Sequence, residues 1–113
     1  MLKAIVSNDT PTCISLLQGS QEILQQRTAI DLNTPLHLAS RFGHVELVKQ
    51  IVNLCPEMVG AENNKLETPL HEACRRGNTQ VFKLLLETDP LASIKRNHRN
   101  HSALFIEIGR AHV

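Results

Sequence analysis

Residues 34–39 read Thr-Pro-Leu-His-Leu-Ala, and residues 68–73 repeat them as Thr-Pro-Leu-His-Glu-Ala. A weaker third copy, Ser-Ala-Leu-Phe-Ile-Glu, occupies residues 102–107, so the three copies start at positions 34, 68 and 102 with a constant period of 34 residues. A fixed period in this range is typical of repeat proteins, in which similar units stack on one another. We therefore expect a solenoid rather than a domain built around one central core.

The first two copies have the residues that begin and end a short helix. A threonine hydroxyl can cap a free backbone N–H at the helix start, and proline suits the first helical position because its missing N–H has no helical partner there. A glycine lies nine residues after each threonine, where it can end the helix and let the chain reverse. The first helix of each unit should therefore span about two turns. The residues with these structural roles are Thr34, Pro35, Gly43, Thr68, Pro69 and Gly77.

A second helix is predicted after each glycine. Apolar residues recur with the i, i+3, i+4 spacing of a helix face in residues 45–52 and again in residues 81–86. A proline follows each of these segments and cannot continue a helix, and polar residues then lead to the next unit. The predicted fold is all-α, an extended solenoid of helix-turn-helix units joined by hairpin-like loops.

Residues 1–28 fit a degenerate first unit that caps the stack. With an offset of 35 residues, Ala4, Asn8, Asp9, Cys13, Leu16 and Leu17 fall on Ala39, Gly43, His44, Val48, Ile51 and Val52. The connector that follows, residues 18–33, is rich in glutamine and lacks the proline found in the later units. Its helix boundaries are therefore the least well defined in the chain.

A 34-residue helix-turn-helix unit opened by Thr-Pro-Leu-His-x-Ala resembles the ankyrin repeat. The resemblance divides the chain into a capping repeat at residues 1–28, ankyrin repeats at 29–62 and 63–96, and a truncated repeat at 97–113. It implies a non-catalytic module for protein-protein interaction.

The residues around the end of the second helix narrow this resemblance. Cys-Pro-Glu at residues 55–57 and the asparagine-rich connectors look like plant membrane-anchored ankyrin proteins of the accelerated-cell-death type. In that group the ankyrin array is N-terminal and cytosolic, and it precedes a hydrophobic membrane domain that this sequence does not contain. The resemblance thus implies the N-terminal fragment of a larger signalling or defence-related protein, in the cytoplasm or on the cytosolic side of a membrane.

The loops depart from the ankyrin pattern at five positions. Leu32, Leu66 and Asn100 stand where a hairpin glycine is usual, and Asn63 and Asn97 stand where aspartate is usual. Glycine adopts a left-handed backbone without a steric cost, and asparagine tolerates it better than most other residues do. The geometry at the two leucine positions is therefore an open question for the structure.

Composition and charge argue against several classes of function. Lys plus Arg number 12 and Asp plus Glu number 11, so a net charge of +1 gives no general attraction for nucleic acid or for an anionic membrane. The apolar runs are far shorter than the roughly 18 residues of a membrane span, and the N-terminal segment has no signal-peptide core. Cys13, Cys55 and Cys74 are odd in number and lack CxxC spacing, which favours reduced, buried thiols.

The sequence predicts no catalytic residue, cofactor or metal site. His71 and Glu72 could begin an HExxH zinc motif, but arginine replaces its second histidine. The ankyrin resemblance instead implies that His37 and His71 bond to the backbone and tie adjacent loops together. His98 and His101 lack a third metal ligand, and no glycine-rich phosphate loop is present. A small enzyme is therefore a remote alternative.

The resemblance places partner contacts on the hairpin tips and the exposed ends of the first helices. Phe42 is the one phenylalanine among these positions, and it suits either a partner contact or packing against the neighbouring repeat. The basic residues at 75–76 and 95–99 favour a protein partner with an acidic patch over nucleic acid, since they lack aromatic neighbours; an ordinary solvated surface is the alternative. The predicted contact residues are Ile30, Asp31, Asn33, Arg41, Phe42, Asn64, Lys65, Glu67, Arg75, Arg76, His98, Arg99 and His101.

The third repeat leaves its pattern at Glu107, where Ala39 and Ala73 put a small residue. A charge buried there would oppose stacking. Residues 107–113 equal the translation, up to its stop codon, of the widely used sequencing-adapter string GAGATCGGAAGAGCACACGTCTGA. We interpret this tail as an artefact and expect the native protein to continue with further repeats. A divergent native tail is the alternative, since its last two residues align with the residues at 44–45.

A stack that stops before a polar terminal cap should be less stable and should expose apolar residues at its open end. The residues expected to be exposed there are Phe82, Leu85, Leu104 and Phe105.

Overall fold

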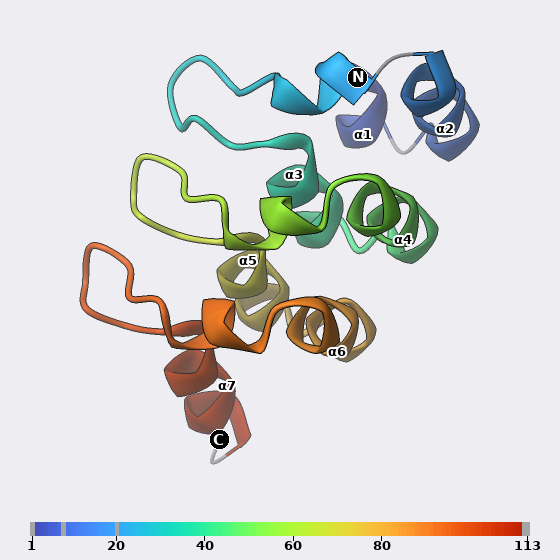
Figure 1. The fold of residues 1–113 in the computed structure, drawn as a ribbon. Helices are drawn as coiled ribbons and strands as arrows, with labels where there is room; N and C mark the ends of the chain where they lie inside the picture. Colours follow the sequence, from blue (N-terminus) through green and yellow to red (C-terminus); the bar gives the residue numbers. More distant parts are fainter. Residues whose placement is uncertain (1, 8, 20, 112–113) are drawn as a thin grey trace.

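The molecule consists of two columns of helices. The structure is a computed structural model, and it describes the backbone of residues 2–7, 9–19 and 21–111. Figure 1 shows the first helices of the units one below the other, the second helices beside them, and the loops projecting from the side of the first helices. The first helices are α1 (Leu2–Val6), α3 (Pro35–Arg41), α5 (Pro69–Arg76) and α7 (Ala103–Ala111). The second helices are α2 (Thr10–Gly19), α4 (Val45–Leu54) and α6 (Thr79–Thr88).

The predicted all-α solenoid is confirmed. Over the described residues no strand is formed, and only an isolated antiparallel bridge joins Arg96 to Ser102 at the base of the last loop. The sequence did not predict the short 3-10 helices that follow each second helix, which are Gln21–Gln25, Pro56–Gly60 and Pro90–Ile94. Each of these 3-10 helices buries an apolar residue at the same position of its unit, namely Leu24, Met58 and Ala92, which are 34 residues apart.

Threonine and proline begin the short first helices, and the chain reverses after them. The Thr34 hydroxyl accepts the N–H of His37 at 3.2 Å, and the N–H of Thr34 donates to His37 Nδ1 at 3.1 Å. Gly43 and Gly77 follow the first helices with φ of 69° and 71°, the left-handed conformation that favours glycine. These local choices set the helix lengths, so that α3 and α5 have 7 and 8 residues.

Gly43 is also in close contact with the next repeat, which makes it sensitive to substitution. A Cβ at this position would lie 2.6 Å from Nδ2 of Asn78, whose Oδ1 accepts the N–H of Val81 at 3.0 Å to cap α6. We expect Gly43→Ala to lower the free energy of unfolding by about 2 kcal/mol, from the left-handed backbone and the disturbed cap. Urea denaturation measures the loss. Gly19→Ala is the matched control because its Cβ would meet no atom within 4 Å; equal losses in both variants would contradict this explanation.

The N-terminal segment has the hydrogen-bonding pattern of a repeat. The N–H of Asp9 donates to the carbonyl of Ala4 at 2.9 Å, as that of His44 donates to Ala39 at 3.0 Å. This bond supports the offset of 35 residues, although the predicted position of Asn8 lies outside the described residues. Cys13 is buried like its counterpart Val48, whereas Leu16 is exposed and its counterpart Ile51 is buried.

The connectors form hairpin-like loops that are hydrogen-bonded to one another. Within a loop, the N–H of Asn63 donates to the carbonyl of Glu67 at 3.0 Å. Between loops, the N–H of Asn64 donates to the carbonyl of Asp31 at 3.0 Å, and the N–H of His98 donates to that of Lys65 at 2.9 Å. The loops therefore form one continuous surface rather than separate flexible projections.

The three residues that replace the hairpin glycine adopt the glycine conformation. Leu32, Leu66 and Asn100 have φ of 58°, 60° and 65°. Both leucine side chains are exposed at the loop tips, so burial gives little compensation for the strained backbone. The two leucines therefore keep the loop geometry that glycine usually provides, and they do so at an energetic cost.

This strain predicts a stabilising substitution. Leu66→Gly should raise the free energy of unfolding by about 1 kcal/mol, since a left-handed leucine costs about 1–2 kcal/mol and the greater unfolded-state freedom of glycine offsets only part of the gain. Chemical denaturation measures the change. Leu66→Ala controls for loss of the side chain and should bring no such gain, and a glycine variant less stable than the alanine variant would contradict the backbone argument.

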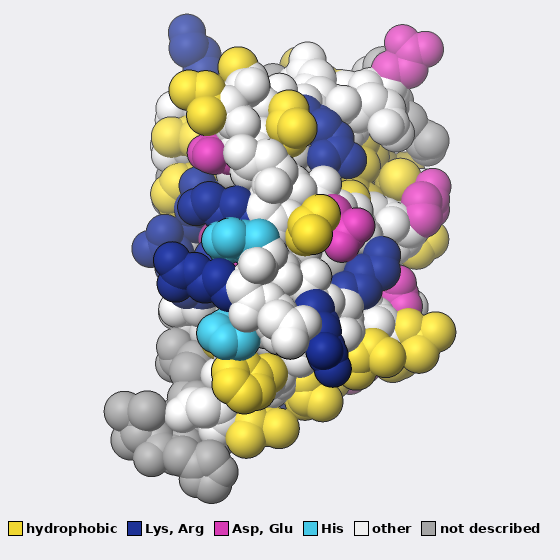
Figure 2. Space-filling view, turned by 90° about the vertical axis from the view of Figure 1, so that its left-hand side faces the viewer, with side chains coloured by type: hydrophobic (Ala, Val, Ile, Leu, Met, Phe, Trp, Pro, Cys, Tyr) yellow, Lys and Arg dark blue, Asp and Glu magenta, His cyan; other side chains and the backbone are white. Residues whose placement is uncertain are grey.

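The open end of the stack differs in part from the prediction. Leu104 and Phe105 on α7 are 41% and 58% exposed, as expected, but Phe82 and Leu85 on α6 are only 7% and 0% exposed. The prediction for these two was wrong because α6 packs against α4, α5 and the last two 3-10 helices, and those two helices were not expected from the sequence. The exposed apolar surface instead includes Leu91 on the last 3-10 helix, and Figure 2 shows apolar side chains along the lower end of the molecule.

Candidate interaction groove

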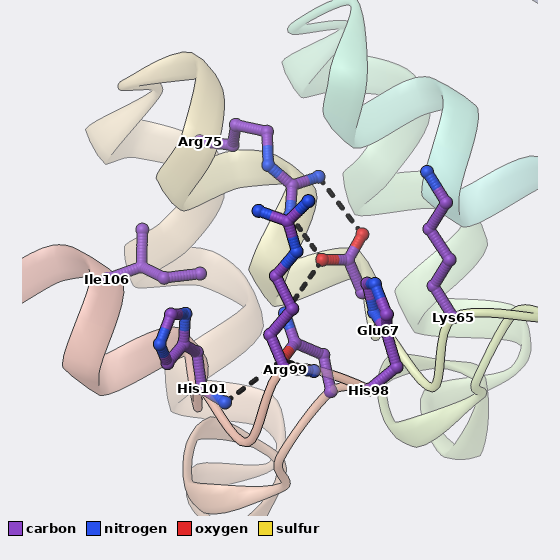
Figure 3. A pocket seen from close by; sticks show the side chains of 8 residues that line it. Lys65, Glu67, Arg75, His98, Arg99, His101 and Ile106 are labelled. Carbon is purple, nitrogen blue, oxygen red and sulfur yellow. Dashed lines mark hydrogen bonds and ion pairs between the residues drawn. The ribbon is translucent and has the colours of Figure 1, made fainter.

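A groove runs between the hairpin loops and the first helices. Two connected cavities of about 110 and 380 Å³ lie along it, the first between α3 and α5 and the second between α5 and α7. They share Lys65, Glu67 and Arg75, which therefore stand at the junction. Figure 3 shows the larger cavity, with the side chains of Lys65 and Arg99 on its loop side and that of Ile106 on its helix side.

A buried carboxylate organises the junction. Glu67 accepts two hydrogen bonds from the guanidinium of Arg75, one of them from Nη1 at 3.0 Å, and a third from Asn97 Nδ2 at 3.0 Å. Burial alone would raise the pKa of Glu67, but these hydrogen bonds and the charge of Arg75 lower it below its ordinary value. The carboxylate is therefore ionised at neutral pH and holds a loop of the next repeat in place.

A second buried carboxylate ties the arginines of two repeats together. Arg41 donates from Nε and Nη2 to the two carboxylate oxygens of Glu72, both at 3.1 Å, in a bidentate pair. Arg75 Nη1 also lies 3.6 Å from Glu72 Oε1. Two of the four predicted contact arginines, Arg41 and Arg75, are thus paired with carboxylates inside the protein, which largely compensates their charges.

The uncompensated positive charge lies elsewhere on the groove. Within the part of the chain that the structure describes, Lys65, Arg76 and Arg99 form no side-chain hydrogen bond or ion pair, while Lys95 donates to the carbonyl of Gly60 at 2.9 Å. Figure 2 shows Lys, Arg and His side chains gathered on one side of the loop face. The free charges therefore concentrate around α5 and the last two loops.

Asparagines link each loop to the preceding one. Asn63 Oδ1 accepts the N–H groups of Lys65 and Glu67 at 2.9 and 3.0 Å, while its Nδ2 donates to Asn33 Oδ1 at 2.8 Å. Asn97 repeats this arrangement, with Glu67 in the place of Asn33. An aspartate could accept the loop N–H groups but could not donate to the preceding repeat. The amide is therefore what makes the connection between repeats.

His37 and His71 connect repeats through the backbone. His37 Nε2 lies 2.7 Å from the carbonyl of Glu67, and His71 Nε2 lies 2.9 Å from that of His101. Because Nδ1 of each ring accepts a threonine N–H, Nε2 carries the proton and donates in the neutral ring. Burial lowers the pKa of His37 to about 4 and lowers that of His71 as well, so both rings are neutral at pH 7.

The predicted contact residues fall into two groups in the structure, those exposed at the groove and those buried beneath it. All of them except Ile30 and Phe42 line one of the two cavities; these two are exposed nearby, with Phe42 in ring contact with His44. Asn33 and Glu67, however, are only 1% and 2% exposed. Burial leaves them almost no side-chain surface for a partner, so we place these two residues in the internal network instead.

Several groove residues were missed from the sequence. Asn63 and Asn97 had a signal in their recurrence one period apart, and Glu72 departs from the equivalent residue of the preceding unit, a leucine. Phe105, which lies next to the groove residue His101, had none, because its ring stacks on His101 with 4.8 Å between centroids only after the loop folds back onto α7. An exposed aromatic ring therefore does lie against one residue of the basic cavity, His101.

Two further findings concern only the described part of the chain. No group of three or more His, Cys, Asp or Glu side chains there is arranged to hold a metal ion. Among the same residues, no helix combines the length and the apolar character needed to cross a membrane.

The stacked units, the paired caps and the hydrogen-bonded loops define a repeat solenoid of the class used as interaction scaffolds. The family model for ankyrin repeats (3 copies) matches residues 1–98, and the chain therefore belongs to the ankyrin repeat family. A chain of the crystal structure of the yeast ribosomal protein Rps3 in complex with its chaperone Yar1 is similar, with a TM-score of 0.83, 24% identity, and coverage of 97% of this chain and 81% of that chain. No curated protein sequence matches significantly.

Proposed function

We propose that the groove between the loops and the first helices binds an acidic surface of another protein. The ankyrin family is typically a non-catalytic scaffold for protein-protein interaction, and this chain matches it over residues 1–98. The observation that carries the proposal is the separation of charges. Arg41 and Arg75 are compensated by buried carboxylates, whereas Lys65, Arg76 and Arg99 face the groove without a partner in the described structure.

The proposed contact surface consists of exposed residues on both sides of the groove. Arg41 and Arg75 contribute the exposed parts of their side chains, which are 27% and 45% accessible. The similar yeast structure contains a chaperone and a ribosomal protein, but at 24% identity that likeness shows the fold alone, so the partner class proposed here rests on the chemistry of the groove. The remaining contacts are Ile30, Asp31, Phe42, Asn64, Lys65, Arg76, His98, Arg99 and His101.

We also propose how the chain divides into repeats and what kind of longer protein it comes from. Residues 29–62 and 63–96 are complete ankyrin repeats, residues 1–28 form a capping repeat, and residues 97–113 begin another repeat whose segment from 107 is not native. The array belongs to a larger cytoplasmic signalling or defence-related protein. A membrane-anchored plant ankyrin protein is the second candidate for this parent, supported by the resemblance carried by residues 55–57. Recovery of the native transcript tests both statements.

Charge reversal tests the proposed function. Wild-type protein, a groove variant Lys65→Glu/Arg99→Glu and a control variant Lys49→Glu/Lys83→Glu are used to capture proteins from cell extract. Lys49 on α4 and Lys83 on α6 are exposed and lie outside the groove, so the control changes charge equally. We expect the wild type and the control variant to capture proteins that the groove variant does not capture. Identical captured sets from all three would overturn it.

A further inference from the structure

The groove extends beyond the two basic cavities toward the N-terminus. A further cavity of about 400 Å³ lies between α1 and α3, and Leu2, Val6 and Leu38 form its apolar wall. Val6 is 58% exposed although it is a large apolar residue, and Leu2 is partly exposed. Lys3 and Asp31 line the same cavity with opposite charges. This end of the groove is therefore suited to an apolar side chain.

The three cavities are continuous along the first helices. The apolar cavity shares Asp31, Asn33 and Arg41 with the middle one, which in turn shares three residues with the basic cavity beside α7. Neighbouring packed helices lie about 8–10 Å apart, so two steps along the column separate the apolar and basic ends by about 16–20 Å. An extended peptide, which rises about 3.3 Å per residue, covers that distance in five or six residues.

The two ends differ in their free charge. Near α5 and the last two loops, Lys65, Arg76 and Arg99 carry positive charges that no carboxylate of the described structure compensates. At the N-terminal end, Lys3 and Asp31 line the cavity with opposite charges, and Arg41 is already paired with Glu72. Complementarity thus requires an apolar group at one end of the ligand and negative charge at the other.

We infer that the groove binds an extended peptide segment with an apolar side chain about five or six residues away from a pair of acidic side chains. The apolar side chain enters the cavity formed by Leu2, Val6 and Leu38, and the acidic pair meets Lys65 and Arg99. This inference rests on the proposed function and specifies the ligand of the same groove. The loops, locked together by hydrogen bonds, present a preformed channel, which limits the ordering cost to that of the peptide.

A peptide fits these observations better than a single-stranded nucleic acid does. A nucleic acid carries charge at every nucleotide and stacks its bases on aromatic rings along a basic groove. Here the three cations without a carboxylate partner, Lys65, Arg76 and Arg99, lie toward one end. The aromatic contact seen at that end, His101 with Phe105, is a single stack and not a series of rings along the groove. The apolar cavity at the other end has no role in contacting a phosphate backbone.

Fluorescence anisotropy with designed peptides tests the inference. The probes are fluorescein-labelled peptides of glycine, serine and glutamine that carry one leucine and two adjacent glutamates, separated by two, five or six, or nine residues. Matched probes replace the glutamates with glutamine or the leucine with glycine, and a labelled oligothymidylate of similar length stands for nucleic acid. The protein is the full chain, as wild type, Val6→Glu, Lys65→Glu/Arg99→Glu, or the control Lys49→Glu/Lys83→Glu.

The tightest binding is expected at a separation of five or six residues. Replacing the glutamates or reversing Lys65 and Arg99 should each weaken that binding about tenfold, and the two changes together should weaken it little further because they remove the same contact. Val6→Glu should abolish the preference for leucine and leave the preference for glutamate intact. The control variant should bind like the wild type.

Three results would overturn the inference: absence of peptide binding, affinity independent of the separation, or tighter binding of the oligothymidylate than of every peptide. If the peptides fail while the groove variant still loses proteins that the control variant captures, the peptide pattern is wrong and the proposed function stands. If the captured proteins are unaffected by the groove variant, the proposed function itself is wrong.

Discussion

Replacing His37 with alanine is expected to lower the free energy of unfolding by about 3–4 kcal/mol. The ring is fully buried and joins two repeats, since Nδ1 accepts the N–H of Thr34 and Nε2 donates to the carbonyl of Glu67. Alanine leaves both backbone groups unpaired in the interior and opens a cavity, and each of these effects costs on the order of 1–3 kcal/mol. Urea denaturation followed by circular dichroism measures the loss.

The matched control is His98→Ala, which removes an exposed loop histidine and should change stability by less than about 0.5 kcal/mol. If His37→Ala is unfolded without denaturant, a series in a stabilising osmolyte restores a measurable transition. A variant as stable as His98→Ala would show that the histidine bridge contributes little to the contact between repeats.

Mild acid is expected to destabilise the protein well before its carboxylates are protonated. The folded-state pKa of His37 is lowered to about 4 by burial, against an ordinary value of 6.5, so between these values the unfolded chain binds more protons than the folded one. Stability is therefore fully present above pH 6.5 and falls as the pH drops toward 4. For His37 alone the loss between pH 7 and pH 5 is about 2 kcal/mol.

The direction at His71 is the same, which adds to the loss in this window. The pKa of Glu67 is lowered instead, so its contribution is lost only as the pH falls below the ordinary value of 4.5. Denaturation at pH 7, 6 and 5 separates the two effects, and nuclear magnetic resonance of the imidazole protons identifies the rings that stay neutral. Constant stability from pH 7 to pH 5 would contradict the buried neutral histidines.

The fold was predictable because its determinants are local and repeated. The capping by Thr34, the helix start at Pro35 and the left-handed turn at Gly43 are each local, so they can be derived from the residues beside them. The constant period of 34 residues then predicted that the units stack on one another. The burial of Phe82 and Leu85 was not predictable in the same way, because it depends on the 3-10 helices, whose starting prolines indicate only that a helix ends.

The charge pattern of the groove could not be derived from residue types alone. Arg41 and Arg75 have the same charge as Arg99 in the sequence, but only the first two pair with a buried carboxylate, Arg41 across a repeat boundary and Arg75 within its own repeat. Glu72 pairs with Arg41 from 31 residues away, a distance along the chain that becomes a contact only when two units stack. Which cations are free for a partner is therefore decided by tertiary structure.

Site-specific photo-crosslinking shows whether partner proteins bind in the groove. A photoreactive benzophenone amino acid replaces His98 at the groove in one protein and Lys83 on α6 in another, and both are illuminated in cell extract. We predict crosslinked partner proteins from position 98 and none of the same proteins from position 83. Crosslinking of the same partners from position 83, with none from position 98, would contradict binding in the groove.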